Sequence, residues 1–391
     1  MADRSVDMLL VGGGIASAMA AHTLRAEGFE GSVAVVGREP HPPYHRPPAS
    51  KAYLRGEHGP EGAHVHPTEW WEAEGVELLT RTSVLSLDAT AREATLSSKE
   101  VVAFDRALVA TGAMVRRLAV DGAQLEGVHY LRALGNADTI RDDVEGAERV
   151  VCVGGSYIAS EVAASLTELG HKVTMVMLES DPLERSFGPV AGAYFRRVLE
   201  EHGIEVLGGE EVERFEGDER VERVVTQGGR VVAADAVICG VGAVPDVMLA
   251  RKSGLALGEL GGVLCDSRLQ TSADGIFAAG DMCEYDSVVH ERVVRIEHEE
   301  VAAAQGRTAA RNMLGADVAH DEVPYFFSDL SNWASLQYVG PAQAWDEEQV
   351  DGDVDSGAFS VAYREGGRLR AMLSVGGFGD LDAARAELRG A

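Results

Sequence analysis

Short apolar runs, glycine turns and amphipathic stretches alternate along the first half of the chain. Apolar residues at 6–11 predict a strand, Gly12 to Gly14 a tight turn, the stretch up to about Glu27 a helix, and residues 32–36 a second strand. Residues 148–179 repeat this order, and Gly154 stands where Gly12 stands in the first copy. Two copies of one strand–turn–helix–strand unit form an internal repeat, which is much more specific than either copy alone.

Later apolar runs complete an α/β pattern. From about Asp321 the composition changes, and the runs 358–365 and 368–375 flank Gly366-Gly367 and have the pattern of paired strands. We therefore expect an α/β protein with two Rossmann-type domains and a small α+β C-terminal domain. The expected boundaries are residues 1–115 with 244–320 for the first domain, 116–243 for the second and 321–391 for the third.

The two glycine turns predict phosphate sites. A phosphate binds at a helix N-terminus because main-chain N–H groups and the helix dipole point there, and glycine lets the backbone approach it. The first unit has Gly12 and Gly14, whereas the second has Gly154, then Ser156 and Ala159 where glycine is usual. The Cβ of Ser156 would crowd a pyrophosphate, unless its hydroxyl donates to the phosphate instead. The second unit is therefore either a working dinucleotide site or a structural copy that binds nothing.

An acidic residue near the end of the second strand of such a unit usually binds the adenosine ribose. Glu39 follows Arg38 in the first unit, and Glu179 follows Met177 and Leu178 in the second. No arginine follows Met177 closely enough to hold a 2′-phosphate, which favours NADH over NADPH. Both glutamates could equally be ordinary solvated loop charges.

Composition and charge narrow the classes of partner. The 391 residues carry a formal net charge of −28, which disfavours nucleic acid and anionic membranes as partners. The apolar segment 8–21 is too short to span a bilayer and follows acidic residues, so we expect a cytoplasmic protein. No C-x-x-C pair is present, so a dithiol or metal site is not expected. The cysteines, for which buried, inert thiols are expected, are Cys152, Cys239, Cys265 and Cys283.

Seven stretches, in one order, resemble a known family over essentially the whole chain. They are "VGGGIASAMAAHTLRAEGF", "PPYHRPPASKAYL", "ALVATGA", "VGGSYIASEVAA", "FAAGD", "RIEHEEVAAAQGRTAARNMLG" and "VPYFFSDL". The chain resembles the FAD-dependent NAD(P)H:ferredoxin and rubredoxin reductases, which share a fold with apoptosis-inducing factor and with glutathione reductase. The most specific stretch is "PYHRPPASK", residues 43–51.

The resemblance implies FAD on the first unit and NAD(P)H on the second. It places Lys51 and Glu161 beside flavin N5, and Tyr157 as an aromatic gate over the flavin. A lysine there would stabilise the reduced ring, and a buried lysine needs a counter-charge. The position equivalent to Glu161 in the first copy is Met19, so the copies differ in polarity there. The alternative is that Lys51 and Glu161 are solvated surface charges and Tyr157 a core aromatic.

The two units, the resemblance and the departure described below together give the candidate cofactor contacts. On the FAD side these are Gly12, Gly14, Ile15, Ala16, Arg38, Glu39, Arg46, Lys51, Val84, Ala110, Thr111, Gly112, Arg116, Gly280, Asp281, Glu297, His298, Glu299 and Trp333. On the nicotinamide side they are Gly154, Ser156, Tyr157, Ile158, Glu179 and Gly242.

One position departs from the family pattern. Glu299 stands where the family often has a tryptophan against the flavin. We hypothesise that an ionised Glu299 lowers the flavin reduction potential, and that Trp333 supplies the missing aromatic ring. His298 is either a flavin neighbour or a core histidine.

The expected activity is NADH-dependent reduction of a ferredoxin or rubredoxin by a monomer or homodimer. Docking an acidic ferredoxin on so acidic a protein would need a local arginine patch. The candidates for such a patch are Arg292, Arg295, Arg307 and Arg311. Two alternatives stay open: a flavoprotein whose nicotinamide site has decayed and which acts as a binding or signalling protein, and a flavoenzyme of this fold with a quinone, oxygen or a monooxygenase partner as acceptor.

Overall fold

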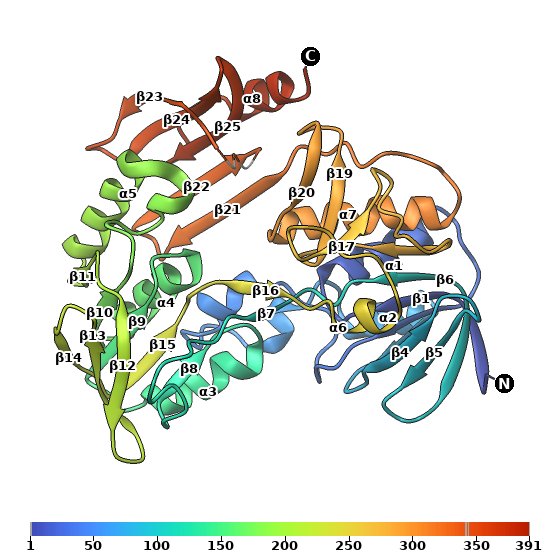
Figure 1. Cartoon of the computed structure of the whole chain (residues 1–391), viewed down its shortest axis with the longest axis horizontal. Coiled ribbons are helices and arrows are strands. Elements are labelled where there is room, and N and C mark those ends of the chain that lie inside the picture. The colour runs from blue at the N-terminus through green and yellow to red at the C-terminus, as the bar shows by residue number, and fades with distance from the viewer. Residues whose placement is uncertain (1, 341, 343, 391) are drawn as a thin grey trace. The chain divides into compact units, whose positions relative to one another are not determined.

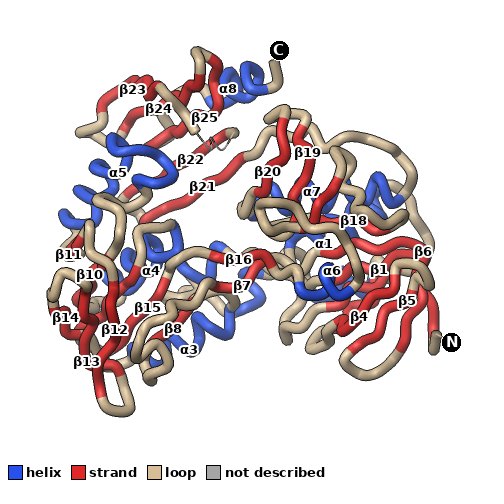
Figure 2. Tube along the Cα trace, in the orientation of Figure 1, coloured by secondary structure: helices blue, strands red, loops and turns tan. Residues whose placement is uncertain are grey.

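The computed structural model describes residues 2–340, 342 and 344–390 (Figures 1 and 2). It is a mixed α/β structure, as expected, and it divides into two compact units. Unit 1 contains residues 1–45, 60–114 and 244–326, and unit 2 contains residues 46–59, 115–243 and 327–391. This division groups the C-terminal region with the middle of the chain and does not separate three domains. The three domain boundaries expected from the sequence therefore stay a prediction.

The largest sheet of unit 1 has the order β3-β2-β1-β6-β5-β4, and β18 pairs with β6. Its strands are β1 (Arg4–Val11), β2 (Val33–Val36), β3 (Val76–Leu79), β4 (Val84–Asp88), β5 (Glu93–Leu96), β6 (Val101–Val109) and β18 (Ile276–Ala278). The neighbours β1, β2, β3, β6 and β18 are parallel, while β5 is antiparallel to β6 and to β4. Leu9, Ala34 and Leu108 on the parallel strands are 0% exposed. Continuous apolar runs suit such strands because both faces are covered.

The helices and a smaller sheet complete unit 1. Helices α1 and α7 pack against each other (Figure 1). Gly306 allows this close crossing, because a Cβ there would lie 2.2 Å from the carbonyl oxygen of Ala16. The remaining elements are α1 (Ile15–Ala26), a 3₁₀ turn (Pro60–Ala63), α2 (Thr68–Ala73), α6 (Met248–Lys252), α7 (Glu299–Met313) and the sheet of β17 (Val263–Cys265), β19 (Cys283–Ser287) and β20 (Arg292–Arg295).

Strand register brings the loops that follow four strands to one edge of the main sheet. Val11, at the end of β1, is paired with Val36 of β2 and with Val109 of β6, and Val109 is paired with Ala278 of β18. The carboxyl ends of these parallel strands therefore lie side by side. The turns that follow them lie at the position where α/β sheets of this kind bind ligands.

Unit 2 contains a second parallel sheet with the order β11-β10-β9-β15-β8. Its strands are β8 (Val128–Tyr130), β9 (Arg149–Val153), β10 (Lys172–Val176), β11 (Glu205–Leu207) and β15 (Ala236–Cys239). Val153 is paired with Val176 and Cys239, so the edge that carries the second glycine turn is built like that of unit 1. The accompanying elements are a 3₁₀ turn (Pro47–Ser50), α3 (Leu134–Val144), α4 (Tyr157–Glu168), α5 (Glu184–Glu201), β12 (Val212–Gly217), β13 (Val221–Thr226) and β14 (Val231–Ala233).

The C-terminal region forms a five-stranded sheet with the order β21-β22-β25-β24-β23. Its elements are β21 (Tyr325–Leu330), β22 (Ala334–Val339), β23 (Glu347–Asp353), β24 (Ala358–Glu365), β25 (Arg368–Val375) and α8 (Leu381–Leu388). The predicted pair around Gly366-Gly367 is confirmed as β24 and β25. Where the chain passes between the units, β7 (Ala113–Val115) pairs with β16 (Ala243–Pro245).

The repeat and the cysteines of the fold match the expectations from the sequence. The repeat is confirmed, since β1, α1 and β2 are matched in order by β9, α4 and β10. The expected burial of the thiols is also confirmed, since all four cysteines are buried and unpaired. Among the described residues no helix combines the length and the apolarity needed to cross a membrane.

Candidate functional site

The glycine turn of unit 1 is shaped by a close backbone approach. Gly12 has a φ of +126°, and a Cβ there would lie 2.0 Å from the carbonyl oxygen of Ala110. A Cβ on Gly14 would meet no atom within 4 Å. Gly14 is the N-cap residue of α1, so no side chain covers the first N–H groups of this helix at that position. The turn therefore leaves open space at a helix N-terminus, which fits the pyrophosphate of a dinucleotide.

Hydrogen bonds connect the other predicted FAD segments within unit 1. The hydroxyl of Thr111 donates to the carbonyl oxygen of Asp246 at 2.6 Å, and the guanidinium of Arg38 lies 3.2 Å from the Asp246 carboxylate. The main-chain N–H of Gly280 donates to Gln305 Oε1 at 2.7 Å. Sequence reasoning missed Asp246 and Gln305, which hold these loops from distant parts of the chain.

Glu39 and Asp281 also have partners in unit 1. The hydroxyl of Tyr44 donates to Glu39 Oε2 at 2.5 Å, so Glu39 is not a merely solvated charge. The guanidinium of Arg295 donates to the carbonyl oxygen of Asp281 at 3.0 Å and forms an ion pair with Glu297. These contacts leave the turn at Gly280-Asp281 well supported.

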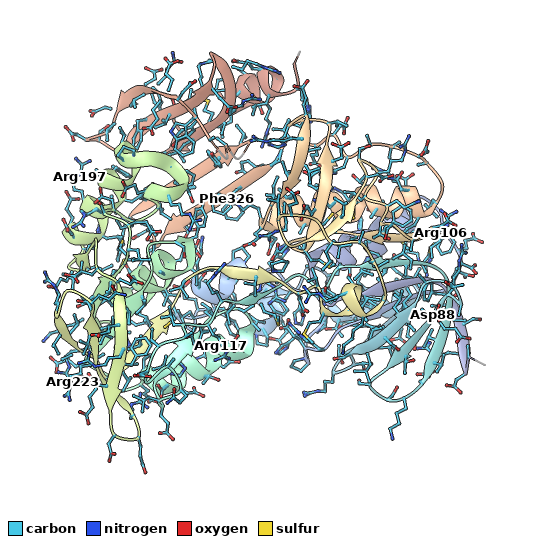
Figure 3. The ribbon with its side chains drawn as sticks, in the orientation of Figure 1. Asp88, Arg106, Arg117, Arg197, Arg223 and Phe326 are labelled. Carbon is cyan, nitrogen blue, oxygen red and sulfur yellow. The ribbon has the colours of Figure 1, made fainter. Side chains whose placement is uncertain are left out.

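Glu299 forms a pair that the sequence did not predict. His45 Nδ1 lies 2.6 Å from Glu299 Oε1, and the hydrogen bond to Glu299 raises the pKa of His45. His298 behaves differently, because burial lowers its pKa to about 4. Its ring packs on Phe326, which Figure 3 labels, at 4.4 Å between centroids. Within unit 1, His298 is therefore a neutral, packed histidine.

The glycine turn of unit 2 repeats the same construction. Gly154 has a φ of +115°, and a Cβ there would lie 2.3 Å from the carbonyl oxygen of Gly240. Ser156 has an ordinary φ of −86°, and its hydroxyl donates to that same Gly240 oxygen at 2.8 Å. The hypothesis that this hydroxyl donates to a phosphate needs correction, because the hydroxyl is already engaged inside the turn. Ser156 thus supports the turn and does not cap α4 with its side chain.

The residues after β10 separate into a core side chain and a loop carboxylate. Met177 is buried at 1% exposure, while Leu178 is 64% exposed. A Cβ on Gly155 would lie 3.0 Å from Met177 Sδ and 3.3 Å from Glu179 Oε2. The Glu179 carboxylate therefore lies at the glycine turn, where the ribose of a dinucleotide binds. The buried Met177 side chain packs against the turn at Gly155.

Lys51 and Glu161 come together in unit 2. The two prolines at 47–48 start the 3₁₀ turn, and the N–H of Lys51 donates to the carbonyl oxygen of Pro48 at its end. Lys51 Nζ lies 3.3 Å from Glu161 Oε1, and the two residues are 8% and 6% exposed. The interpretation of these residues as separate solvated charges is therefore wrong. Asp329, Ser50 and Ser328 also contact this pair, and none of the three was predicted from the sequence.

Two predicted aromatic residues have partners within unit 2. Tyr157 packs edge to face on Phe187, with ring centroids 5.8 Å apart, and burial raises its pKa. Trp333 stacks on His202 at 4.0 Å, and its indole N–H donates to Glu168 at the C-terminal end of α4. These contacts account for the ring of Trp333 without a flavin. Its assignment as a substitute aromatic ring stays a hypothesis.

The remaining predicted contacts occupy loop and helix-terminal positions. The guanidinium of Arg46 donates to the carbonyl oxygen of Arg132 at 2.8 Å, and the N–H of Arg116 donates to the carbonyl oxygen of Gly242 at 2.9 Å. Ile15 and Ala16 open α1, Ile158 lies in the first turn of α4, and Val84 begins β4.

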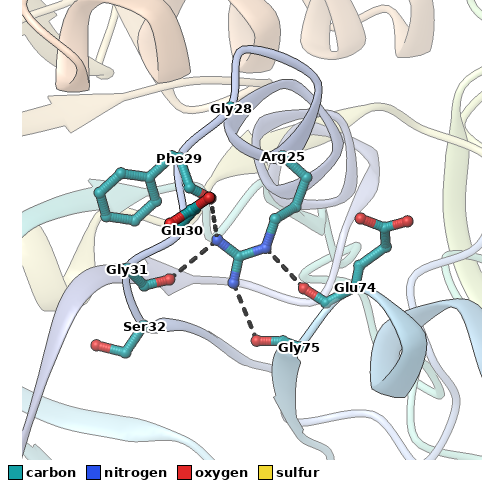
Figure 4. A pocket seen from close by; sticks show the side chains of 8 residues that line it. All are labelled: Arg25, Gly28, Phe29, Glu30, Gly31, Ser32, Glu74 and Gly75. Atoms are coloured by element: carbon teal, nitrogen blue, oxygen red, sulfur yellow. Dashed lines mark hydrogen bonds between the residues drawn. The ribbon is translucent and has the colours of Figure 1, made fainter.

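A cavity of about 600 Å³ near the end of α1 is structural (Figure 4). The guanidinium of Arg25 donates there to four carbonyl oxygens, those of Phe29, Gly31, Glu74 and Gly75. Four of the five guanidinium donors of Arg25 are thus used by main-chain oxygens, so this side chain fastens the surrounding loops. No cluster of metal-binding side chains occurs among the residues that the structure describes.

Comparisons with known proteins agree with this geometry. A family model described as pyridine nucleotide-disulphide oxidoreductase matches residues 6–306. Rhodocoxin reductase of Rhodococcus erythropolis is 34% identical over 97% of this chain and 88% of its own length. Putidaredoxin reductase of Pseudomonas putida is 32% identical over 94% of this chain and 88% of its own length.

Solved structures are similar over nearly the whole chain. The ferredoxin reductase for the CYP199A2 system of Rhodopseudomonas palustris matches with a TM-score of 0.90 and 31% identity, over 94% of this chain and 91% of its own. The covalent complex of putidaredoxin reductase with putidaredoxin matches with a TM-score of 0.92 and 31% identity, over 100% of this chain and 94% of that chain.

Proposed function

The chain belongs to the pyridine nucleotide-disulphide oxidoreductase family, and on this premise we propose that it uses NADH to reduce a small iron–sulfur protein of the ferredoxin or rubredoxin type. It is an FAD-dependent NAD(P)H oxidoreductase. Bound FAD supplies the chemistry that links a two-electron hydride donor to a one-electron acceptor. The acceptor class is inferred from relatives named for reducing rhodocoxin and ferredoxins.

The chain's own residues bind and orient the two cofactors in this proposal. The open turn at Gly14 and the segments at Thr111 and Asp281 would hold FAD. The turn at Gly154 and the Glu179 carboxylate would hold the nicotinamide dinucleotide. Each turn follows the carboxyl end of a parallel strand and precedes a helix, which is where such folds bind dinucleotides. A phosphate at such a turn is stabilised by the helix dipole and by hydrogen bonds from main-chain N–H groups.

The observation that carries the proposal is the buried Lys51–Glu161 pair, whose nearest charged atoms are 3.3 Å apart. We propose that this pair lies beside the reacting part of the flavin. There, Lys51 would offset negative charge on the reduced ring, and Glu161 would keep the lysine ammonium stable in a buried place.

Stopped-flow reduction of the FAD-loaded protein by NADH under anaerobic conditions tests this assignment. We expect Glu161→Gln to slow flavin bleaching at least about tenfold while FAD stays bound, because one charge of a buried pair is lost. Glu222→Gln removes a carboxylate whose side chain is 60% exposed in the same unit and serves as the matched control. Equal bleaching rates in all three proteins would overturn the role of Glu161.

Glu179 supports a preference for NADH over NADPH. A carboxylate at this turn accepts hydrogen bonds from the ribose hydroxyls of NADH and repels a 2′-phosphate. Hydrogen bonds to a charged group contribute about 1.5–3 kcal/mol. We therefore expect Glu179→Ala to lower the ratio of kcat/KM for NADH over NADPH roughly ten- to hundredfold. An unchanged ratio would contradict this assignment.

The acceptor is identified by steady-state reduction of several candidates. We expect a [2Fe–2S] ferredoxin or a rubredoxin to be reduced faster than a quinone or oxygen. Faster reduction of a quinone would favour the flavoenzyme with another acceptor, and a flavin that never bleaches would favour a decayed nicotinamide site. Disulfide reduction has no support, since the cysteines are buried and unpaired. A cytoplasmic location also stays a proposal.

A further inference from the structure

Lys51 differs from every other lysine in the part of the chain that the structure describes. It is buried, with 8% of its surface exposed. The exposed lysines are Lys99, Lys172 and Lys252. A buried ammonium persists only beside compensating negative charge. The carboxylates that provide this charge therefore decide how strongly the ammonium acts on its surroundings.

The nearest carboxylate to Lys51 is Asp329. Lys51 Nζ donates to Asp329 Oδ2 at 2.7 Å, a typical length for a hydrogen bond between two charged groups. The distance from Nζ to Glu161 Oε1 is longer, at 3.3 Å. The ring of Phe327 lies 5.7 Å from Nζ and adds a cation–π contact. The direct hydrogen-bond partner of the ammonium is therefore on β21 and not on α4.

Glu161 is oriented by other donors. The hydroxyl of Ser50 donates to Glu161 Oε2 at 2.5 Å, and that of Ser328 donates to Glu161 Oε1 at 2.5 Å. Ser50 is held in turn by Ser165, whose hydroxyl donates to the carbonyl oxygen of Ser50 at 2.7 Å. Both carboxylate oxygens of Glu161 thus have a hydroxyl donor without any contribution from Lys51.

Three consecutive residues of β21 contact the Lys51–Glu161 pair. Phe327 and Asp329 contact Lys51, and Ser328 contacts Glu161. With Lys51 protonated and both carboxylates ionised, the group carries one net negative charge. Neutralising Asp329 would leave the ammonium paired with Glu161 alone and would make the group neutral.

We propose that Asp329 is a positioning residue that holds the Lys51 ammonium, so that the C-terminal strand β21 sets how much positive charge Lys51 presents to the flavin. This inference rests on the proposed function, in which Lys51 lies beside the flavin. Removal of the Asp329 charge would leave Lys51 less compensated, favour the negatively charged reduced flavin and raise its reduction potential.

The test compares the wild-type holoenzyme with Asp329→Asn, which keeps the size of the side chain. Competitive acetylation across a pH series, read by peptide mass spectrometry, gives a titration midpoint for each lysine. The three exposed lysines are internal references. We expect the Lys51 ammonium to lose its proton at least about tenfold more readily in the variant, because it loses a counter-charge. We also expect the flavin midpoint potential to shift upward.

Asp382→Asn is the matched control, because its side chain is 91% exposed and lies on α8. It should change neither readout. If Asp329→Asn does not fold, Asp329→Ser removes the same charge and takes its place.

An unchanged Lys51 midpoint in the Asp329 variant would overturn the proposal, even if NADH still bleaches the flavin. A shifted midpoint with an unchanged flavin potential would overturn the link between Asp329 and the flavin. A wild-type protein that NADH does not bleach would instead overturn the proposed function. The two failures are therefore distinguishable.

Discussion

At the residue scale, the pair of His45 and Glu299 has the most direct dependence on pH. The hydrogen bond to Glu299 raises the pKa of His45, and Glu300 adds to this effect. The folded protein therefore favours protonated His45. This contribution to stability is fully present below the unfolded pKa of about 6.5 and is lost as the pH rises through the higher folded value.

His45→Gln tests this linkage. We expect the wild-type protein to have a higher Tm than the variant near pH 6, with the difference shrinking as the pH rises above the folded pKa of His45. Thermal unfolding across a pH series measures it. His58→Gln is the control, since the ring of His58 is hydrogen-bonded to the carbonyl oxygen of the neighbouring Gly59 rather than to a carboxylate. A difference in Tm that is constant with pH would contradict the linkage.

The same pair changes what is expected of the flavin. Protonated His45 offsets the charge of Glu299, so Glu299 can lower the flavin potential fully only once His45 is neutral. We expect the potential of wild type to lie below that of Glu299→Gln by an amount that grows as the pH rises. Spectroelectrochemical titration at several pH values measures this. A wild-type potential no lower than that of the variant at high pH would remove the hypothesis.

At the element scale, two glycines of one turn have different physical tasks. Gly12 has a positive φ and faces the Ala110 carbonyl oxygen, whereas the space at Gly14 is open. We expect Gly12→Ala to reduce the free energy of unfolding by about 2 kcal/mol or more, because φ strain and a clash act together. Gly14→Ala should leave apoprotein stability nearly unchanged but weaken FAD binding.

Chemical unfolding of the apoproteins and fluorescence titration with FAD separate these effects. Equal stability losses in both variants would show that Gly14 is also needed for the fold. An unchanged FAD affinity in Gly14→Ala would contradict the pyrophosphate site at this turn.

The sequence predicts the positions of the two helices of the repeat but not the contacts of the side chains at their N-termini. Their positions follow from local periodicity and from the glycines before them. The direction of the Ser156 hydroxyl was not readable, because its acceptor, the carbonyl oxygen of Gly240, belongs to a strand end 84 residues away. The burial of Met177 against Gly155 was not readable either, since only the folded turn brings the two residues together.

At the scale of the whole molecule, the net charge of −28 opposes association with an acidic partner. The arginines considered for a docking patch are largely engaged. Arg295 pairs with Glu297, Arg307 lies 3.4 Å from Glu322, and Arg311 lies 3.0 Å from Glu27. These three arginines therefore provide little uncompensated positive charge.

We expect kcat/KM for an acidic ferredoxin to rise as salt increases from about 10 mM to about 150 mM, because salt screens the repulsion between like charges. Steady-state reduction of an acidic and a basic acceptor protein, in parallel, measures this, and the basic acceptor should respond in the opposite direction. A rate that falls with salt for the acidic ferredoxin would reveal a local basic docking surface.

Local sequence patterns alone establish the α/β class, the repeat and the two glycine turns. These features depend on local patterns, such as the period of apolar positions and the residue types that a tight turn tolerates. The pairing of Lys51 with Glu161 was also anticipated, but through a family resemblance and not through spacing.

The groups that complete that pair come from distant parts of the chain and meet only in the fold. Asp329 is 278 residues from Lys51, and Ser328 is 167 residues from Glu161. His45 and Glu299 are separated by 254 residues. Contacts at such separations leave no periodic trace in the chain, because they are set by how sheets and helices pack and by which side chains a buried charge requires. The polar groups around the predicted residues therefore become visible only in the folded molecule.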